Sequence, residues 1–423
     1  MLSAREQTLC RLIEQRRAAL LDDLRLHVAL PTGHNNTPAL DEARERLTTR
    51  CRALGATLEL IPGDPRPDWL HSADSGPATI PPVAVCRRRH AAAPAPRSVI
   101  LIAGHLDTVH DPDGPFRALS VATDGKTALG PGCVDMKGGL VIAIAALEAL
   151  AEAGIDLDWS FLLNSDEETG SFHSDLALRA EAARPEYRAA IALEPAMADG
   201  GLAVQRGGSG QFILEATGRA AHVGRDFASG RSAVDALAQS ILHAHALSDV
   251  PRGVCINVSP LWCPNPANMV ADQARAWGNA RFPTAESGDR LESALRALPT
   301  SIRPPADPAR SGGWAPGELR VQTAFTRPAK PLTPQVQLLA DAARAAAADL
   351  GQSLPFGKTA GVCDGNNLQH AGLPTLDTLG VRGGGLHTPQ EWIELSSLVE
   401  RCQLLSILLS RLASGVGSPS AGN

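Results

Sequence analysis

Histidines and acidic residues stand in short glycine-rich segments of this chain, and residues of these types hold zinc in proteins. Histidine occurs in GHLDTV as His105 and in GGGLHTPQEW as His387. The acidic residues of these and similar segments are Asp107, Asp135, Glu167, Glu168 and Glu194. Each follows an apolar run of strand length or lies in a glycine-rich turn, where the backbone can approach a ligand closely. Open α/β sheets collect such residues at the carboxyl ends of parallel strands, so we expect these side chains to converge.

Taken singly, these residues have ordinary structural explanations. A lone histidine after a strand is usually a hydrogen-bonded structural residue, and Asp135 could cap a helix. Glu167 and Glu168 could begin a helix, and Glu194 could merely end a strand. Together, however, several acids at one sheet edge would repel one another unless cations neutralised them. The set therefore predicts two zinc ions that share one aspartate, each with a histidine and a carboxylate, and one further carboxylate free to act as a base.

The elements that must position these residues follow from the apolar pattern. Continuous apolar runs predict strands that are buried on both faces, and longer periodic segments predict helices. The strands are expected within 98–109, 158–168 and 187–195, and the helices at 3–28, 40–54 and 136–154. This alternation is typical of an α/β fold with a mixed, mostly parallel sheet and helices on both faces.

The pattern changes near Gly207 and returns after Pro331. Between these points the sequence predicts a smaller α+β unit with an antiparallel sheet. Its strands are expected at 211–218, 254–262, 274–282 and 319–327, and its helices at 232–247 and 287–298. We therefore predict a catalytic domain made of 1–207 and 331–423 with an inserted domain, 208–330, between its parts. A Pro-rich segment, 304–318, is expected to be a mobile loop, and the tail 414–423 to be disordered.

The composition excludes several classes of protein. With 423 residues, 44% hydrophobic and 20% charged, the chain has ordinary values for a globular protein, and its net charge of −6 disfavours nucleic acid or an anionic membrane as a partner. The first residues carry charges where a signal peptide needs an apolar core. The eight cysteines include no CxxC pair and are expected to be reduced thiols. The sequence thus predicts a cytoplasmic protein.

Six motifs in a fixed order resemble those of the M20 metallopeptidases. They are GHLDTV, GPGCVDMKGG, NSDEETGS, ALEP, GRAAHVG and GGGLHTPQEW. The resemblance is nearest to the glutamate carboxypeptidase (carboxypeptidase G2-like) branch of this aminoacylase/acetylornithine deacetylase superfamily. It runs from PTGHNN at 31–36 to the last predicted helix. It implies a zinc-exopeptidase-like fold, an inserted lid and dimerisation domain, and hydrolysis of amide bonds.

The resemblance also implies roles for the residues singled out above. His105 and Glu194 would bind one zinc ion, Glu168 and His387 the other, with Asp135 between them. Asp107 would orient the His105 imidazole, and Glu167 would be the general base. The peptide bond between Asp135 and Met136 would be cis, although Met136 stands where many members have Asp or Asn. Each subunit would hold two Zn²⁺, with Co²⁺ or Mn²⁺ as possible substitutes.

The inserted domain would contribute to catalysis and to substrate binding. His222 in GRAAHVG would reach into the partner's active site of a homodimer and stabilise the oxyanion. Asn268 and Arg281 would hold the substrate's carboxylate, for which a guanidinium is suited because it can pair with both oxygens. Gly384 and Gly385, just before His387, would let the substrate backbone lie close to the metals.

Three classes of function stay open at this point. One is a dizinc carboxypeptidase acting on peptides or N-acyl amino acids. A second is a deacylase of N-acyl amino acids or an aminopeptidase on small peptides; the aminopeptidase would need an acidic group for the substrate's ammonium. The third is a pseudo-enzyme that binds ligands without turnover, which predicts a lost ligand or base, whereas the chain retains the full set.

Overall fold

The computed structural model describes residues 1–70, 79–90, 99–299 and 315–415. Most of the segment 304–318 and nearly all of the tail 414–423, for which mobility and disorder are predicted above, lie outside these residues.

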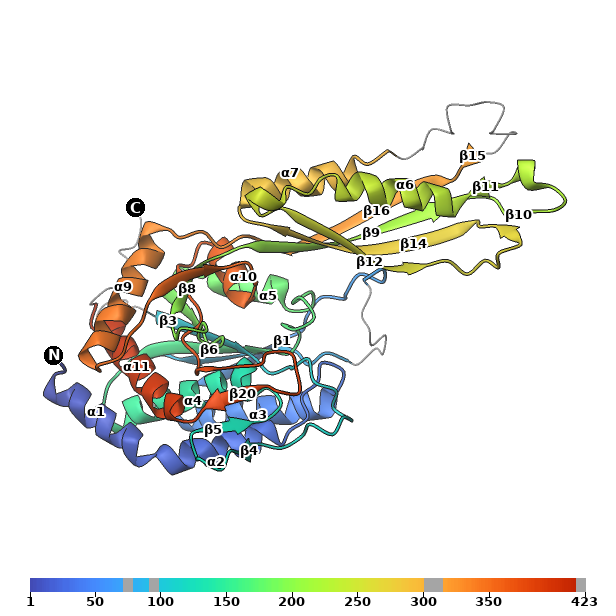
Figure 1. The fold of residues 1–423 in the computed structure, drawn as a ribbon. Helices are drawn as coiled ribbons and strands as arrows, with labels where there is room; N and C mark the ends of the chain where they lie inside the picture. Colours follow the sequence, from blue (N-terminus) through green and yellow to red (C-terminus); the bar gives the residue numbers. More distant parts are fainter. Residues whose placement is uncertain (71–78, 91–98, 300–314, 416–423) are drawn as a thin grey trace.

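A six-stranded sheet forms the centre of the larger part of the molecule (Figure 1). Across the sheet, its strands are β1 (Thr57–Ile61), β2 (Val83–Arg88), β6 (Asp158–Asn164), β3 (Val99–His105), β7 (Tyr187–Ala192) and β18 (Thr375–Leu376). The last four are parallel neighbours, whereas β1 and β2 are antiparallel at one edge. The predicted mixed, mostly parallel sheet is confirmed, and the antiparallel strands β1 and β2 are an addition that the apolar pattern did not predict.

Helices cover both faces of this sheet, because the side chains of its strands alternate between two apolar clusters. Ile100 and Ile102 of β3 pack into one cluster, and Val99 and Leu101 into the other. The first face is covered by α1 (Ala4–Gln15), α2 (Arg17–Val28), α3 (Thr37–Ala53), α4 (Gly138–Glu152), α9 (Pro334–Asp349) and α11 (Ser396–Ala413). The second is covered by α5 (Asp175–Ala182) and α10 (Asp364–His370).

The N-terminal segment differs from its prediction as one long helix. It divides at Arg16, whose backbone leaves the helical region, into α1 and α2. Ser3 caps α1 and forms a capping box with Glu6, which satisfies amides that have no partner within the helix. None of the helices in the described ranges has the length and apolar character that a bilayer span requires.

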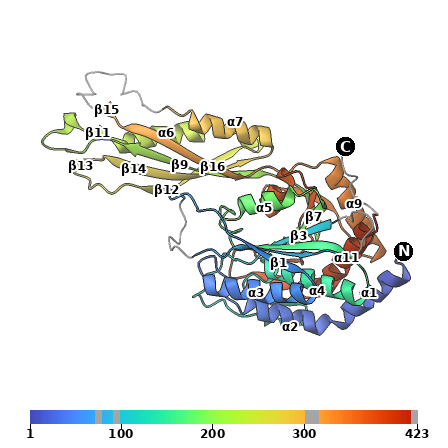
Figure 2. The ribbon, with the colours of Figure 1, turned by 180° about the vertical axis from the view of Figure 1, so that it is seen from behind.

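The inserted segment forms an antiparallel sheet of its own. Across the sheet, the strands are β12 (Cys255–Trp262), β14 (Gln273–Phe282), β9 (Gly208–Thr217) and β16 (Glu318–Arg327). Helices α6 (Ala233–His245) and α7 (Ala285–Arg296) lie on the side that faces away from the larger unit, as both views show (Figures 1 and 2). A separate apolar cluster joins helices and sheet, so this unit has its own core. The four strands and two helices predicted here are confirmed.

Several short strands were not predicted, because segments of two to five residues carry little periodicity. A four-stranded antiparallel sheet contains β19 (Gly383–Gly384), β20 (Trp392–Glu394), β5 (Thr127–Leu129) and β4 (Ser120–Val121). Two-stranded sheets pair β8 (Leu202–Arg206) with β17 (Phe356–Thr359), β10 (Ala221–His222) with β13 (Met269–Val270), and β11 (Arg231–Ser232) with β15 (Ala315–Pro316). The single turns are η1 (Cys133–Lys137), η2 (Phe227–Ser229) and η3 (Val250–Arg252).

Candidate active site

Three neighbouring parallel strands bring acidic residues and a histidine to one edge of the six-stranded sheet. His105 is the last residue of β3, Glu167 and Glu168 follow β6, and Glu194 follows β7. Because β6, β3 and β7 are adjacent and parallel, their carboxyl ends lie side by side. The convergence predicted for these residues is present.

Asp135 and His387 reach the same place from turns, in the glycine-rich segments in which the sequence contains them. Asp135 lies in η1, the turn directly before α4, and its peptide bond with Met136 is cis. Gly132 lies directly before η1 and has a left-handed backbone, with φ 69°. A side chain there would clash, because its Cβ would lie 2.5 Å from Thr108 Cγ2. His387 lies in the loop between β19 and β20 and has a left-handed backbone, with φ 61°.

The turn that carries Asp135 is held by a buried carboxylate, Glu391, which lies next to β20. Its two oxygens accept hydrogen bonds from the amides of Gly132 (2.8 Å), Val134 (2.9 Å) and Asp135 (3.0 Å). His110 Nε2 contacts the same carboxylate. Glu391 is 1% exposed, so these charge-assisted bonds replace its hydration. The position of Asp135 therefore depends on Glu391, a residue that belongs to neither group of candidate ligands.

The candidate ligands form two groups that share Asp135. In one group, atoms of His105, Asp135 and Glu194 lie within 4.8 Å of one another; in the other, Asp135, Glu168 and His387 do. His105 Nε2 is 3.3 Å from Asp135 Oδ1, and His387 Nε2 is 3.4 Å from Asp135 Oδ2. A further 3.3 Å separates His387 Nε2 from Glu168 Oε2. Each oxygen of Asp135 thus faces a different histidine.

The electrostatics of this cluster show an excess of buried negative charge. Burial and, next to it, the charge of nearby Asp135 raise the pKa of Glu194 to about 8. Burial, again with Asp135, also raises the pKa of Glu168. Hydrogen bonds to Asp135 and Glu168 raise the pKa of His387 to about 10. When acids cluster without a cation between them, their pKa values rise and the neighbouring imidazoles stay protonated. A bound cation would neutralise the same charges.

A pair of divalent cations fits the residues present. Two buried atoms, His105 Nε2 and Asp135 Oδ1, have no well-aligned hydrogen bond within the described part of the chain. Leaving such atoms without partners costs free energy, so a ligand between them would be stabilising. Imidazole nitrogens and carboxylate oxygens on both sides of a shared aspartate are the donor set that zinc takes. The same donors also accommodate other divalent transition metals.

Asp107 supports both the histidine and the acidic turn. The backbone carbonyl of Asp107 lies 2.9 Å from His105 Nδ1, and its carboxylate Oδ1 lies 3.5 Å away. The carboxylate oxygens accept hydrogen bonds from the amides of Glu167 (3.2 Å) and Glu168 (2.9 Å). Asp107 therefore orients the His105 imidazole mainly through its carbonyl, while its carboxylate holds the turn that carries the two glutamates.

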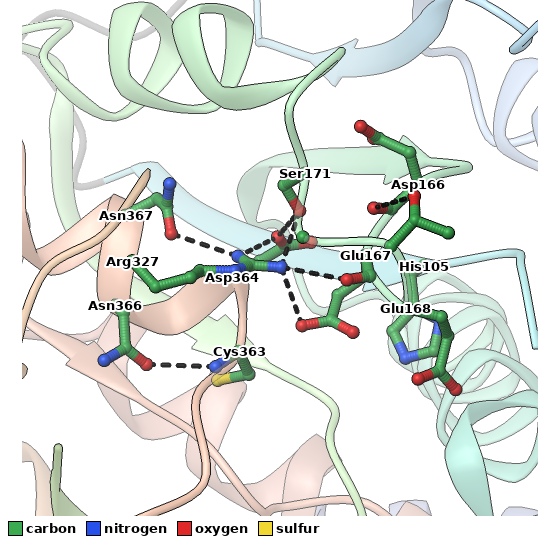
Figure 3. A network of polar contacts seen from close by, with 12 residues as sticks. His105, Asp166, Glu167, Glu168, Ser171, Arg327, Cys363, Asp364, Asn366 and Asn367 are labelled. Carbon is green, nitrogen blue, oxygen red and sulfur yellow. Dashed lines mark hydrogen bonds and ion pairs between the residues drawn. The ribbon is translucent and has the colours of Figure 1, made fainter. Parts of the chain in front are cut away.

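Glu167 lies beside the ligand cluster and is paired with an arginine from the inserted unit. Arg327 Nη2 donates to Glu167 Oε1 at 2.8 Å (Figure 3). Burial raises the pKa of Glu167 well above its ordinary value, and Glu194 adds to this, whereas Arg327 opposes it. A buried carboxylate with a raised pKa close to a metal site has the properties of a general base.

Two pockets adjoin the ligand cluster, and Glu167, Glu168 and His387 line both. The larger, of about 490 Å³, extends below the inserted sheet and is also lined by Arg281 of β14. The smaller, of about 390 Å³, has a mainly apolar further lining that includes Pro195, Ala196, Met197, Val362 and Leu386. The two pockets leave room for parts of a substrate beside the ligand cluster.

The structure does not bring the other predicted residues of the inserted unit to this site. His222 is exposed in β10, which pairs with β13, next to Asn268. β10 lies at the end of the inserted unit farthest from the six-stranded sheet (Figure 1).

Gly384 and Gly385 precede His387 as predicted, but neither is among the described residues that line the two pockets.

Comparison with known proteins identifies the family. The profile of the peptidase family M20/M25/M40 matches residues 101–411. The chain belongs to this family. The resemblance carried by the six motifs is thereby confirmed, and the protein is an enzyme, a metallopeptidase of the M20 type.

The relatives of this M20 peptidase include enzymes with several specificities. Carboxypeptidase G2 from Pseudomonas sp. (strain RS-16) is 26% identical over 326 residues, which cover 75% of this chain and 74% of that protein. The metallo-carboxypeptidase Sso-CP2 from Sulfolobus solfataricus matches with a TM-score of 0.66 and 15% identity, covering 93% of this chain and 99% of that one. The dipeptidase Dug1p from Saccharomyces cerevisiae matches with a TM-score of 0.71 and 14% identity, covering 97% of this chain and 98% of that one. These structures show the M20 fold.

Two residues of this M20 site were missed from the sequence. Glu391 stands in the quoted motif GGGLHTPQEW, four residues after His387, and its place in that motif was the available signal. Arg327 ends an amphipathic strand of the inserted unit, where an arginine is ordinary. Only the buried contact between β16 and the turn after β6 reveals that Arg327 belongs to the site.

Proposed function

We propose that this M20 peptidase is a dizinc carboxypeptidase that cleaves the amide bond next to a residue with a free carboxylate, in peptides or N-acyl amino acids. The observation that carries the proposal is the position of two ligand groups sharing Asp135, with Glu167 and Arg281 in one pocket beside them. One zinc ion would be held by His105, Asp135 and Glu194, and the other by Asp135, Glu168 and His387. When bound, the ions would polarise the scissile carbonyl and lower the pKa of water.

The residues of the chain supply proton transfer. Glu167 accepts a proton from the attacking water and delivers it to the leaving amine. Its raised pKa suits this exchange, because a base that matches the operating pH both accepts and returns a proton readily. Asp107 keeps the His105 imidazole and the Glu167 backbone in place.

Arg281 is the proposed clamp for the substrate's carboxylate. Its Nε donates to Asn279 Oδ1 at 3.0 Å, and no carboxylate of the described residues forms an ion pair with it. Burial and the nearby cation of Arg327 lower the pKa of Arg281, so an anion in the pocket would be stabilising. The second pocket, with its largely apolar lining around Met197 and Leu386, would then take the acyl side of the amide.

The site is proposed to be completed by a second copy of the chain. His222 and Asn268 lie near each other at the distal end of the inserted unit. In a homodimer formed through the inserted units, His222 would stabilise the oxyanion of the partner's substrate, and Asn268 would help to hold its carboxylate.

The pocket chemistry separates this proposal from an aminopeptidase. Arg66 and Arg281 line the larger pocket. Cations there disfavour a substrate ammonium and favour a carboxylate. A deacylase of N-acyl amino acids would use the same clamp, so only the preferred acyl group distinguishes it from a peptide carboxypeptidase.

The decisive experiment measures metal content and substrate preference together. The purified protein should hold close to two zinc equivalents, and a chelator should abolish activity until metal is restored. Hydrolysis is then compared over dipeptides, N-acyl amino acids and the corresponding amino-acid amides. Full activity of thoroughly metal-free protein, or a preference for the amides, would contradict the proposal.

A further inference from the structure

Arg327 is a buried cation that the proposed roles do not use. It is the last residue of β16 in the inserted sheet, and its side chain is 3% exposed. The register of β16 against β9 shifts between Ala324 and Arg327. Such an irregularity re-aims the side chains that follow it. The guanidinium consequently enters the larger unit, where it contacts the turn after β6 (Figure 3).

The guanidinium holds Glu167 at two points. Arg327 Nη2 donates to the carboxylate oxygen Oε1 at 2.8 Å and to the backbone carbonyl of Glu167 at 3.2 Å. The same nitrogen donates to Ser171 Oγ at 2.6 Å. Both the side chain and the main chain of Glu167 are thus fixed by one residue of the inserted unit.

A second set of contacts fixes the guanidinium itself. Arg327 Nη1 donates to Asp364 Oδ1 at 2.7 Å and to Asn367 Oδ1 at 3.0 Å, both in α10. Ser171 Oγ closes the network by donating to the same Asp364 oxygen at 2.7 Å. A planar fork with several donors can bridge two carboxylates in this way, whereas an ammonium group concentrates its charge at one point.

We propose that Arg327 is a positioning residue that holds the Glu167 carboxylate in its reactive orientation, so that the inserted unit sets the geometry of the base. This inference rests on the proposed function, in which Glu167 is that base. A general base must lie within hydrogen-bond reach of the proton it takes. A misplacement of about 1 Å can lower the rate by roughly a hundredfold.

The pairing of Arg327 distinguishes it from the clamp at Arg281. Arg327 already neutralises two acids, Glu167 and Asp364, whereas the side chain of Arg281 donates only to the amide oxygen of Asn279 among the described side chains. A substrate carboxylate would have to displace an internal ion pair at Arg327 but none at Arg281. Arg327 therefore acts on the base and Arg281 on the substrate.

The test compares Arg327→Lys with Arg281→Lys, a matched substitution in the same sheet and the same pocket. For an N-acyl amino acid substrate, Arg327→Lys should lower kcat by roughly 10- to 100-fold while KM stays within about threefold and both metal equivalents remain. Arg281→Lys should instead raise KM. In a Glu167→Ala background, Arg327→Lys should change the residual rate by less than about threefold, because a residue acting through Glu167 has nothing left to orient.

Ser171→Ala provides a second variant that leaves every charge paired. It removes one contact of the network and should lower kcat by a few fold at unchanged KM and metal content. If Arg327→Lys fails to fold, Ser171→Ala decides the matter, and an unchanged kcat overturns the proposal. A raised KM for Arg327→Lys that persists in the Glu167→Ala background also overturns it, since Arg327 would then bind substrate. Wild-type protein without metal-dependent hydrolysis would refute the proposed function instead.

Discussion

At the scale of single residues, two adjacent glutamates face different tasks. Glu168 is within 3.3 Å of His387 and belongs to a ligand group, whereas Glu167 is paired with Arg327 and belongs to none. Their backbone amides are held by the same carboxylate, Asp107. Substitutions at Glu167 and Glu168 should therefore have different effects, one on proton transfer and the other on metal binding.

The first prediction separates these two roles. Glu167→Ala should keep close to two metal equivalents and lower kcat by roughly two to four orders of magnitude, the usual contribution of a general base. Glu168→Ala should weaken metal binding. Metal analysis and steady-state kinetics of both variants provide the measurement. Loss of metal from Glu167→Ala with retention in Glu168→Ala would show that the assignments are reversed.

The second prediction concerns the carboxylate clamp. Arg281→Ala should raise KM sharply for substrates with a free α-carboxylate, because a bidentate ion pair is lost. It should change KM little for the corresponding amides, which cannot form that pair. Equal changes for acid and amide substrates would show that Arg281 does not recognise the carboxylate.

At the scale of elements, the candidate metal centre is assembled from a sheet edge and two irregular loops. His105 ends β3, and Glu168 and Glu194 follow β6 and β7, but the shared candidate ligand Asp135 depends on a turn. That turn is held by Glu391, which precedes the short strand β20. A residue outside the ligand set should therefore influence metal affinity.

The third prediction follows from this support. Glu391→Gln replaces one acceptor oxygen with a donor that faces backbone amides, so Asp135 should be held less firmly. We expect metal affinity to fall by about 10- to 100-fold, as is usual for residues that orient metal ligands. Glu394→Gln is the matched control: Glu394 lies in β20 and pairs with Arg382 instead of the turn. Equal affinities of the two variants, measured by competition with a chelator, would exclude a role for Glu391.

At the scale of the whole molecule, the charges of the ligand cluster link metal binding to stability. Without ions, the pKa of Glu194 is raised to about 8 from 4.5, and that of His387 to about 10 from 6.5. Raised folded-state pKa values mean that the folded chain binds more protons than the unfolded chain, so the contribution of these groups to stability is lost as the pH rises. Bound ions would replace these protons.

The fourth prediction is a pH-dependent stabilisation by metal. The difference in Tm between metal-loaded and metal-free protein should increase from about pH 5.5 to about pH 8, because protons compete with the ions for the same ligands. Thermal unfolding of both forms across this range measures it. A difference that stays constant or shrinks as the pH rises would contradict the ligand set.

The fifth prediction tests the proposed composite site. Homodimers of Glu167→Ala and of His222→Ala should both be nearly inactive, because every site lacks one part. In a mixed dimer, one site is intact and the other lacks both parts. Random pairing makes half of the dimers mixed, so activity should recover to roughly a quarter of wild type per subunit. No recovery in demonstrated mixed dimers would mean that His222 serves its own subunit or is not catalytic.

The amino-acid sequence alone determined the main elements and the family. Long periodic segments such as α4 and β14 could be predicted because burial of one or both faces leaves a pattern over many residues. The candidate ligands His105, Glu168 and Glu194 could be predicted because they stand where buried strands end. The short strands β4, β5, β19 and β20 could not, since two or three residues carry no period.

The tertiary structure alone decided how residues from distant segments combine. Arg327 and Glu167 are 160 positions apart, and only the docking of β16 on the turn after β6 makes them an ion pair. Glu391 reaches the turn of Asp135 from a position 256 residues away. A single sequence records which side chains are available, but buried polar contacts of this kind depend on long-range packing that has no local signature. Their partners are therefore fixed only when the sheets and loops are assembled.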